Sequence, residues 1–87
     1  MEPASAGPHR RPEAIAFGEL IREYRAKGTV TYTQATLAEA LDPPVTPGAV
    51  GQWEAGLTLP TTSRQMALVR LLGIPWNKVE AIYRRAA

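Results

Sequence analysis

The side chains of this 87-residue chain that could do chemistry are hydrogen-bonding groups rather than nucleophiles or general acids. The chain has one histidine, His9, and no cysteine, and its carboxylates form no pair at the spacing of a shared catalytic site. No glycine-rich phosphate loop follows a strand, because no segment alternates long enough to be one. We therefore expect a protein that is not an enzyme, with no metal site, no cofactor and no small-molecule substrate.

Groups that suit a phosphate are concentrated between Thr58 and Arg64. This stretch holds several hydroxyl side chains and one cation, and phosphates are often held by such neutral donors together with backbone N–H groups. The structural alternative is that the hydroxyls cap the helix that follows, as Thr61 is placed to do. Thr33 and Thr46 occupy the same capping position before two other predicted helices.

The stretch TPGAVGQWEAG, residues 46–56, predicts a short helix with an uncharged surface. Thr46 is a suitable N-cap, Pro47 suits the first helical position, and a glycine follows the end. The helix carries no Lys or Arg, and its only charge is Glu54. Gly48 and Gly51 each cost about 1 kcal/mol relative to alanine in a helix. Close approach of a partner would offset that cost, and an unconstrained surface is the alternative.

The charges are distributed unevenly along the chain. The formal net charge is +2, but residues 28–63 contain no Lys or Arg, so the basic residues lie in the two flanks. If a polyanion binds beside the helix at residues 46–55, the arginines of the flanks should converge there. The arginines expected to converge are Arg10, Arg11, Arg64, Arg84 and Arg85.

Apolar residues recur at helical spacing in five segments, which predicts an all-α, compact bundle of five short helices. The predicted helices span residues 12–27, 34–41, 47–55, 62–72 and 75–85. Residues 1–12, rich in proline, predict a flexible N-terminal arm, and residues 13–87 predict the folded domain. Arg10 and Arg11 at the end of the arm are either solvated or touch a phosphate backbone.

The chain has no apolar run long enough to span a membrane and no signal-peptide core. Together with the absence of cysteine, this predicts a cytoplasmic protein that does not bind membranes, or one in the host cytoplasm if it is phage-encoded.

Three motifs resemble the lambda-repressor-like (Cro/XRE) helix-turn-helix family. They are IREYR at residues 21–25, the Gln34-x-x-Leu37-Ala38 pattern, and VGQWEAG at residues 50–56. The resemblance covers about residues 15–83. The turn at residues 41–45, LDPPV, departs from the family because it is two residues longer and has two prolines where a glycine is usual.

The resemblance implies binding to double-stranded DNA, with the helix at residues 46–55 in the major groove. Of its outward positions, Gln52 could pair with an adenine and Ala49 could touch a thymine methyl group. It also implies contacts to the phosphate backbone beside these base contacts. The implied DNA-binding residues are Thr33, Gln34, Thr46, Gly48, Ala49, Gln52, Thr61 and Arg64.

The resemblance further implies an ion pair between Arg25 and Glu54 that orients the third helix on the first. Trp76 and Tyr83 either close the core or form a homodimer interface, as the last helix of the family often does. The function implied is a small prokaryotic or phage transcriptional regulator that acts as a dimer. The alternative is a protein-binding module on the same scaffold, for example a phage factor that docks on host transcription machinery. The cation-free segment 28–63 favours this alternative.

Overall fold

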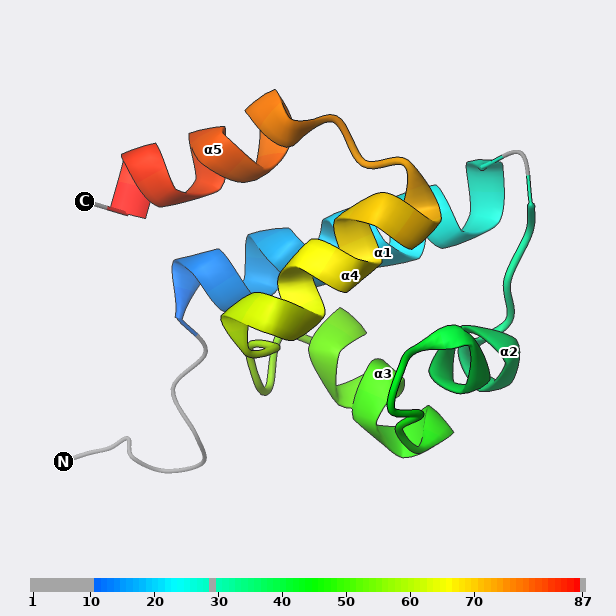
Figure 1. Ribbon diagram of the computed structural model, residues 1–87. Coiled ribbons are helices and arrows are strands. Elements are labelled where there is room, and N and C mark those ends of the chain that lie inside the picture. The colour runs from blue at the N-terminus through cyan, green and yellow to red at the C-terminus, as the bar shows by residue number, and fades with distance from the viewer. Residues whose placement is uncertain (1–10, 29, 87) are drawn as a thin grey trace, which may run out of the picture.

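The computed structural model describes residues 11–28 and 30–86, and in these residues the chain is built from helices without a strand (Figure 1). The helices are α1 (Pro12–Lys27), α2 (Gln34–Ala40), α3 (Pro47–Glu54), α4 (Thr62–Leu72) and α5 (Trp76–Ala86). The all-α prediction is confirmed, and the predicted helix ends lie within one residue of these bounds. Pro12, the last residue of the predicted arm, is the first residue of α1. Residues 1–10, Arg10 included, lie outside the described part.

Capped ends explain why the helices begin and end where they do. A threonine hydroxyl accepts a hydrogen bond from the backbone N–H three residues later at the start of α2, α3 and α4, at 3.0, 3.1 and 3.4 Å. These threonines are Thr33, Thr46 and Thr61. Gly56 and Gly73 follow α3 and α4 with φ of 76° and 69°, a left-handed conformation that glycine adopts without strain.

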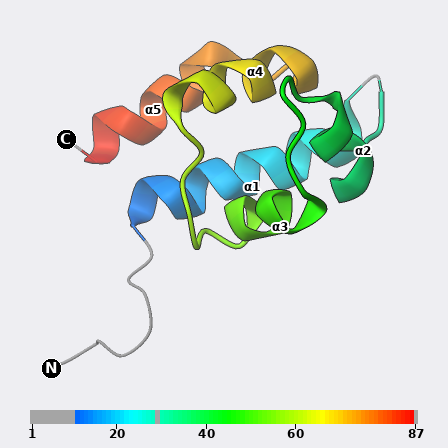
Figure 2. The same cartoon turned by 60° about the horizontal axis from the view of Figure 1, so that its bottom comes forward.

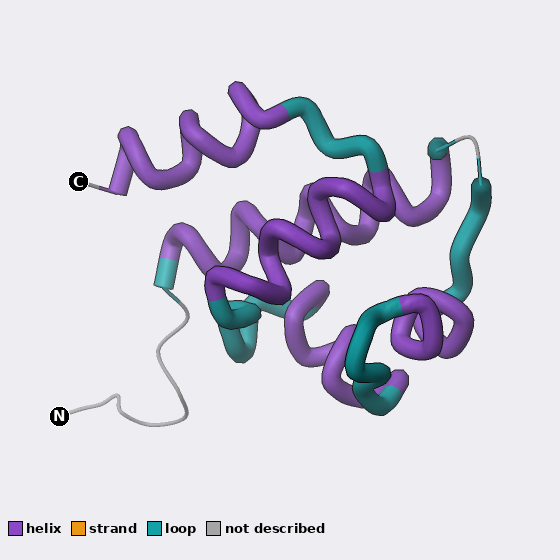
Figure 3. The backbone as a smooth tube through the Cα atoms, viewed as in Figure 1, coloured by secondary structure: helices purple, strands orange, loops and turns teal. Residues whose placement is uncertain are grey.

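Helix α1 is the centre of the bundle, because it packs against α3, α4 and α5, while α2 packs against α3. Helices α3 and α5 lie on opposite sides of α1 in both views of the ribbon (Figures 1 and 2). Short loops join the helices (Figure 3). None of the helices in the described ranges is long and apolar enough to cross a membrane. The largest fully buried side chains between them are Phe17, Ile21, Leu37, Leu41, Val50, Leu68 and Val79.

A glycine on α1 permits its close contact with the end of α3. A Cβ atom at Gly18 would overlap the carbonyl oxygen of Trp53 and lie 2.9 Å from that of Glu54. The backbone of α3 therefore rests directly on α1 at this point, and this contact fixes where the C-terminal end of α3 lies.

The loop between α2 and α3, which contains Pro43 and Pro44, is held at two points. The backbone N–H of Val45 donates to the carbonyl oxygen of Ala38 at 3.1 Å, and the guanidinium of Arg64 donates to the carbonyl oxygen of Pro43. The first bond joins the loop to α2 and the second joins it to α4. The two prolines are thus accommodated in a loop that both neighbouring helices anchor.

Candidate nucleic-acid interface

Helix α3 presents an uncharged surface to solvent. Val50 and Trp53 are buried in the core, as the sequence predicts, and Glu54 is buried as well, with 6 % of its surface exposed. The outward positions include the exposed Gly48 and Gln52, and none of the outward positions carries a charge. The one acidic residue of α3 therefore faces the protein interior.

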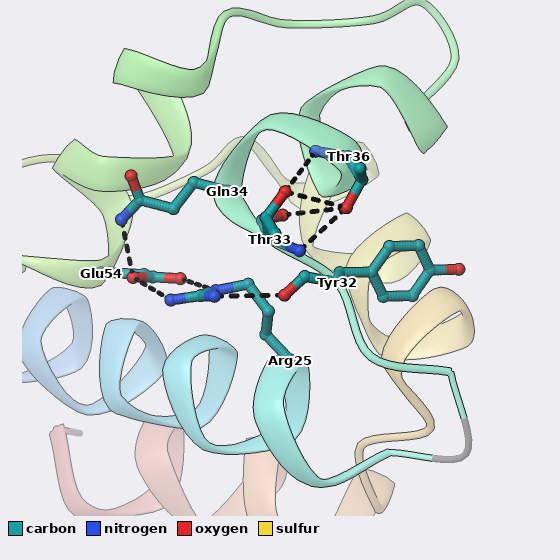
Figure 4. A network of polar contacts seen from close by, with 6 residues as sticks. All are labelled: Arg25, Tyr32, Thr33, Gln34, Thr36 and Glu54. Atoms are coloured by element: carbon teal, nitrogen blue, oxygen red, sulfur yellow. Dashed lines mark hydrogen bonds and ion pairs between the residues drawn. The ribbon is translucent and has the colours of Figure 1, made fainter.

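Glu54 is the centre of a polar network that joins α1, α2 and α3 (Figure 4). Arg25 donates from Nε to Oε2 of Glu54 at 2.6 Å and from Nη2 to Oε1 at 3.2 Å, which is the pairing suggested by the sequence. Arg25 also donates from Nη1 to the carbonyl oxygen of Tyr32 at 3.1 Å. Gln34 donates from Nε2 to Oε1 of Glu54 at 3.0 Å. These bonds fix the start of α2 and the end of α3 relative to α1.

The network also decides the charge of Glu54. Burial raises the pKa of its carboxyl group, but hydrogen bonds from Arg25 and Gln34 and the charges of Arg25 and Arg22 outweigh burial, so the pKa lies below its ordinary value. The hydrogen bond to Glu54 likewise raises the pKa of Arg25. The pair is therefore ionised at neutral pH, and Arg25 balances the negative charge of Glu54.

Gln34 has a structural role that the sequence did not reveal. Its amide lies beside Gly51, where an added Cβ would be 3.5 Å from its Oε1, and one N–H is taken by Glu54. The amide NH₂ has a second hydrogen to donate. The position next to α3 is thus compatible with a phosphate contact, but Gln34 also ties α2 to α3.

The three capping threonines, Thr33, Thr46 and Thr61, are exposed. A hydroxyl that accepts a bond from a backbone N–H can still donate its own hydrogen. At Thr46 and Thr61 the cap is the hydrogen bond that the hydroxyl makes within the described residues, whereas Thr33 also contacts the hydroxyl of Thr36 at 3.1 Å. Capping and phosphate binding are therefore compatible at these positions.

Two arginines from other helices lie near Glu54 of α3 or against the loop that leads into α3. Arg64 of α4 reaches the loop before α3 through its hydrogen bond to Pro43. Arg22 of α1 is exposed and close enough to Glu54 for its charge to lower the pKa of that carboxyl group. Arg22 is not among the residues that the sequence predicts to bind DNA. Its helical spacing from Arg25 places both side chains on the same face of α1. That spacing indicates a role for Arg22 only once the contact between α1 and α3 is known.

Of the arginines that the structure describes, Arg84 and Arg85 do not converge beside α3. Arg11 precedes α1 without a capping hydrogen bond from its side chain, and its Nε lies 4.0 Å from a carboxylate oxygen of Glu13. Arg84 lies 3.6 Å from Glu80 on α5, and Arg85 lines a groove between α1 and α5. Helix α5 is across α1 from α3 (Figure 2). Arg84 and Arg85 of α5 therefore do not meet the expected convergence, whereas Arg64 contacts the loop before α3.

An apolar surface lies where α5 meets the start of α4. Trp76, Met66 and Tyr83 are 55, 46 and 38 % exposed and line one shallow hollow of about 480 Å³. The hydroxyl of Tyr83 donates to Oε1 of Gln65 at 2.6 Å, and Nε2 of Gln65 donates to the carbonyl oxygen of Pro60 at 2.7 Å. Trp76 and Tyr83 thus contribute only partly to the core, and Tyr83 is held in place by the buried Gln65.

In the part of the chain that the structure describes, no group of His, Asp or Glu side chains is arranged to hold a metal ion. Comparison with known families matches the helix-turn-helix model of the Cro/C1, XRE-like type to residues 21–79. No curated protein and no solved structure gives a match. The family match extends from α1 into α5 and includes α2, α3 and the loop between them. Because it covers well over half of the chain, the chain belongs to the XRE-like helix-turn-helix family, a family of DNA-binding, non-enzymatic proteins that regulate transcription.

Proposed function

We propose that this protein is a transcriptional regulator that binds double-stranded DNA as a homodimer, with α3 in the major groove. One observation carries the proposal: the only acidic residue of α3 is buried and paired with Arg25, so the outward surface of α3 carries no negative charge. A surface facing a polyanion must avoid unpaired carboxylates, whereas it can dispense with cations if neighbouring elements supply them.

The residues that read bases are those at the outward positions of α3. Gln52 is exposed, and its side chain makes no hydrogen bond with another described residue. Its amide is therefore available to an adenine, while Ala49 and Gly48 offer a small surface beside it. Thr33, Gln34, Thr46, Thr61 and Arg64 provide the donors for phosphates.

The dimer forms through the apolar surface of α5. Trp76 and Tyr83 are exposed more than core residues are, and a two-fold interface built on them buries the same patch on both copies. Aromatic side chains are enriched at the centres of such interfaces. Arg11 at the edge of this hollow adds a polar border.

The experiment is a titration of labelled random and genomic duplexes with the protein across a salt series that begins at about 50 mM. We expect binding that weakens as salt rises. Gln52→Ala should lower the affinity for the best site by about 1–3 kcal/mol and relax the preference at one base pair. Asn77→Ala, an exposed amide on α5, is the matched control and should bind as the wild type does.

The alternative function is docking on a protein of the transcription machinery, favoured by the absence of Lys and Arg from residues 28–63. A folded protein that binds no duplex at about 50 mM salt would contradict DNA binding and support this alternative.

A further inference from the structure

We propose that Arg22 and Arg64 bracket α3 and contact DNA phosphates on either side of it, so that α1 and α4 supply the charge that α3 lacks. This inference rests on the proposed function and assigns Arg22 a role in it. Helix α3 lies in a segment, residues 28–63, that contains no Lys or Arg, so the positive charge that attracts phosphates must come from other helices.

Arg22 lies on the face of α1 that meets α3. Gly18, Arg22 and Arg25 are spaced i, i+4 and i+7, which places them on one side of the helix. Gly18 contacts the backbone at Trp53 and Glu54, and Arg25 binds the Glu54 carboxylate. Arg22 lies between these two contacts and is therefore beside the C-terminal end of α3.

The positive charge of Arg22 is not neutralised by an ion pair with another described residue. Arg22 is exposed and makes no hydrogen bond or ion pair with another described residue. Glu54, whose pKa the charge of Arg22 helps to lower, is already bound by Arg25 through two hydrogen bonds. The three side chains together carry a net charge of +1, and the exposed member is Arg22.

Arg64 contacts the loop that leads into the N-terminal end of α3. Its hydrogen bond to the carbonyl oxygen of Pro43 holds the guanidinium against the loop that leads into α3. The side chain is half-buried, so its position is restricted before any ligand binds. A guanidinium has five N–H groups, and one bond to Pro43 leaves the others to donate to a phosphate.

Helix α3 is short compared with the grooves of DNA. Helix α3 has eight residues, and a rise of about 1.5 Å per residue makes it about 12 Å long. The major groove of B-DNA is also about 12 Å wide. Arginines beside so short a helix and beside the loop that leads into it remain close to the phosphates that border the groove when α3 lies within it.

The test measures the salt dependence of binding to a random-sequence duplex for the wild type and for Arg22→Gln, Arg64→Gln and Arg85→Gln. Each variant loses one positive charge, but Arg85 lies in the groove between α1 and α5, on the side of α1 away from α3. Each phosphate contact contributes about 0.9 to the slope of log Kobs against log salt. Because both protomers of the proposed dimer carry the substitution, we expect Arg22→Gln and Arg64→Gln each to reduce the slope by about 1.8, or about 0.9 per protomer, and Arg85→Gln to leave it unchanged.

Conservative variants separate charge from structure. Arg22→Lys and Arg64→Lys should keep the wild-type slope, and circular dichroism melts show whether each variant is folded. Arg22→Ala is a second neutral variant and should lose as much slope as Arg22→Gln. A wild-type protein that binds with an Arg22→Gln slope equal to that of Arg85→Gln would overturn this inference alone. A wild-type protein that binds no duplex would overturn the proposed function and this inference together.

Discussion

The carboxylate of Glu54 and the guanidinium of Arg25 form a two-point ion pair, with Nε of Arg25 2.6 Å from Oε2, across 29 residues of sequence. The Glu54 side chain is 3 % exposed and the Arg25 side chain 21 % exposed, so solvent screens the pair only weakly. Because the planar guanidinium must lie in line with the carboxylate, the pair restricts rotation of α3 about its own axis relative to α1. The orientation of the outward surface of α3 therefore depends on this pair.

Replacement of Arg25 by methionine should destabilise the fold strongly. Arg25→Met leaves the Glu54 carboxylate buried with only Gln34 as a partner, and an uncompensated buried charge is costly. We expect a loss of about 2–4 kcal/mol in the free energy of unfolding and a melting temperature lower by about 10 °C or more. Thermal and urea melts followed by circular dichroism measure both quantities.

A double variant identifies the cause of that loss. In Arg25→Met with Glu54→Leu neither charge remains, so the protein should be more stable than Arg25→Met alone. An unchanged melting temperature in Arg25→Met would show that the pair contributes nothing to the fold.

The stability of the fold should depend on pH through Glu54. Its pKa in the folded protein is lower than the ordinary value of 4.5, so its contribution is complete above that value and is lost as the pH falls through the folded-state pKa. We expect the free energy of unfolding to fall below about pH 4.5 in the wild type, and to fall less steeply in Glu54→Gln. Urea denaturation at a series of pH values between about 3 and 7 measures this difference.

Glu23→Gln is the control for this pH dependence. The pKa of Glu23 is also lowered, by its hydrogen bond to Lys27, but both side chains are exposed. Solvent screening makes such pairs weak, so Glu23→Gln should resemble the wild type. A wild-type profile that Glu54→Gln reproduces would contradict the assignment to Glu54.

The helices and their ends were predictable because their signals are local. Thr33 and Thr46 indicate where helices begin, because threonine is a favoured N-cap residue. Apolar spacing places Val50 in the core, since a helix brings residues three and four apart to one face. The dual position of Gln34 was not predictable, because its bond to Glu54 crosses 20 residues and depends on how α2 packs on α3. The position of Arg22 beside α3 was not predictable for the same reason, because it depends on how α1 packs on α3.

The loop before α3 and the surface of α5 also depend on tertiary contacts. The sequence shows that the turn at residues 41–45 is longer than is usual in the family. Only the packed structure shows that Arg64 anchors this loop through Pro43. Similarly, helical spacing places Trp76 and Tyr83 on one face of α5 without showing how much of that face α4 covers.

Trp76 should be required for dimerisation and not for the fold. Its side chain is 55 % exposed, so Trp76→Glu should lower the melting temperature little while placing a charge at the centre of the proposed interface. We expect sedimentation velocity to show a dimer for the wild type and a monomer for Trp76→Glu. Asn77→Glu adds the same charge at an exposed neighbouring position and should remain a dimer. A wild type that is monomeric at high concentration would contradict the proposed interface.

Gly48→Ala should stabilise the protein and weaken its binding to DNA. An added Cβ at Gly48 meets no atom closer than the hydroxyl oxygen of Thr46 at 3.9 Å, so the folded protein has room for it, and alanine favours a helix over glycine by up to about 1 kcal/mol. The same methyl group would protrude from α3 where a base edge approaches its backbone. We expect a higher melting temperature together with a lower affinity in the duplex titration.

Gly18→Ala is the contrast, because its Cβ would overlap the carbonyl oxygen of Trp53 and should lower the melting temperature. A Gly48→Ala variant that is more stable and binds DNA with unchanged affinity would show that no partner approaches α3 closely at Gly48.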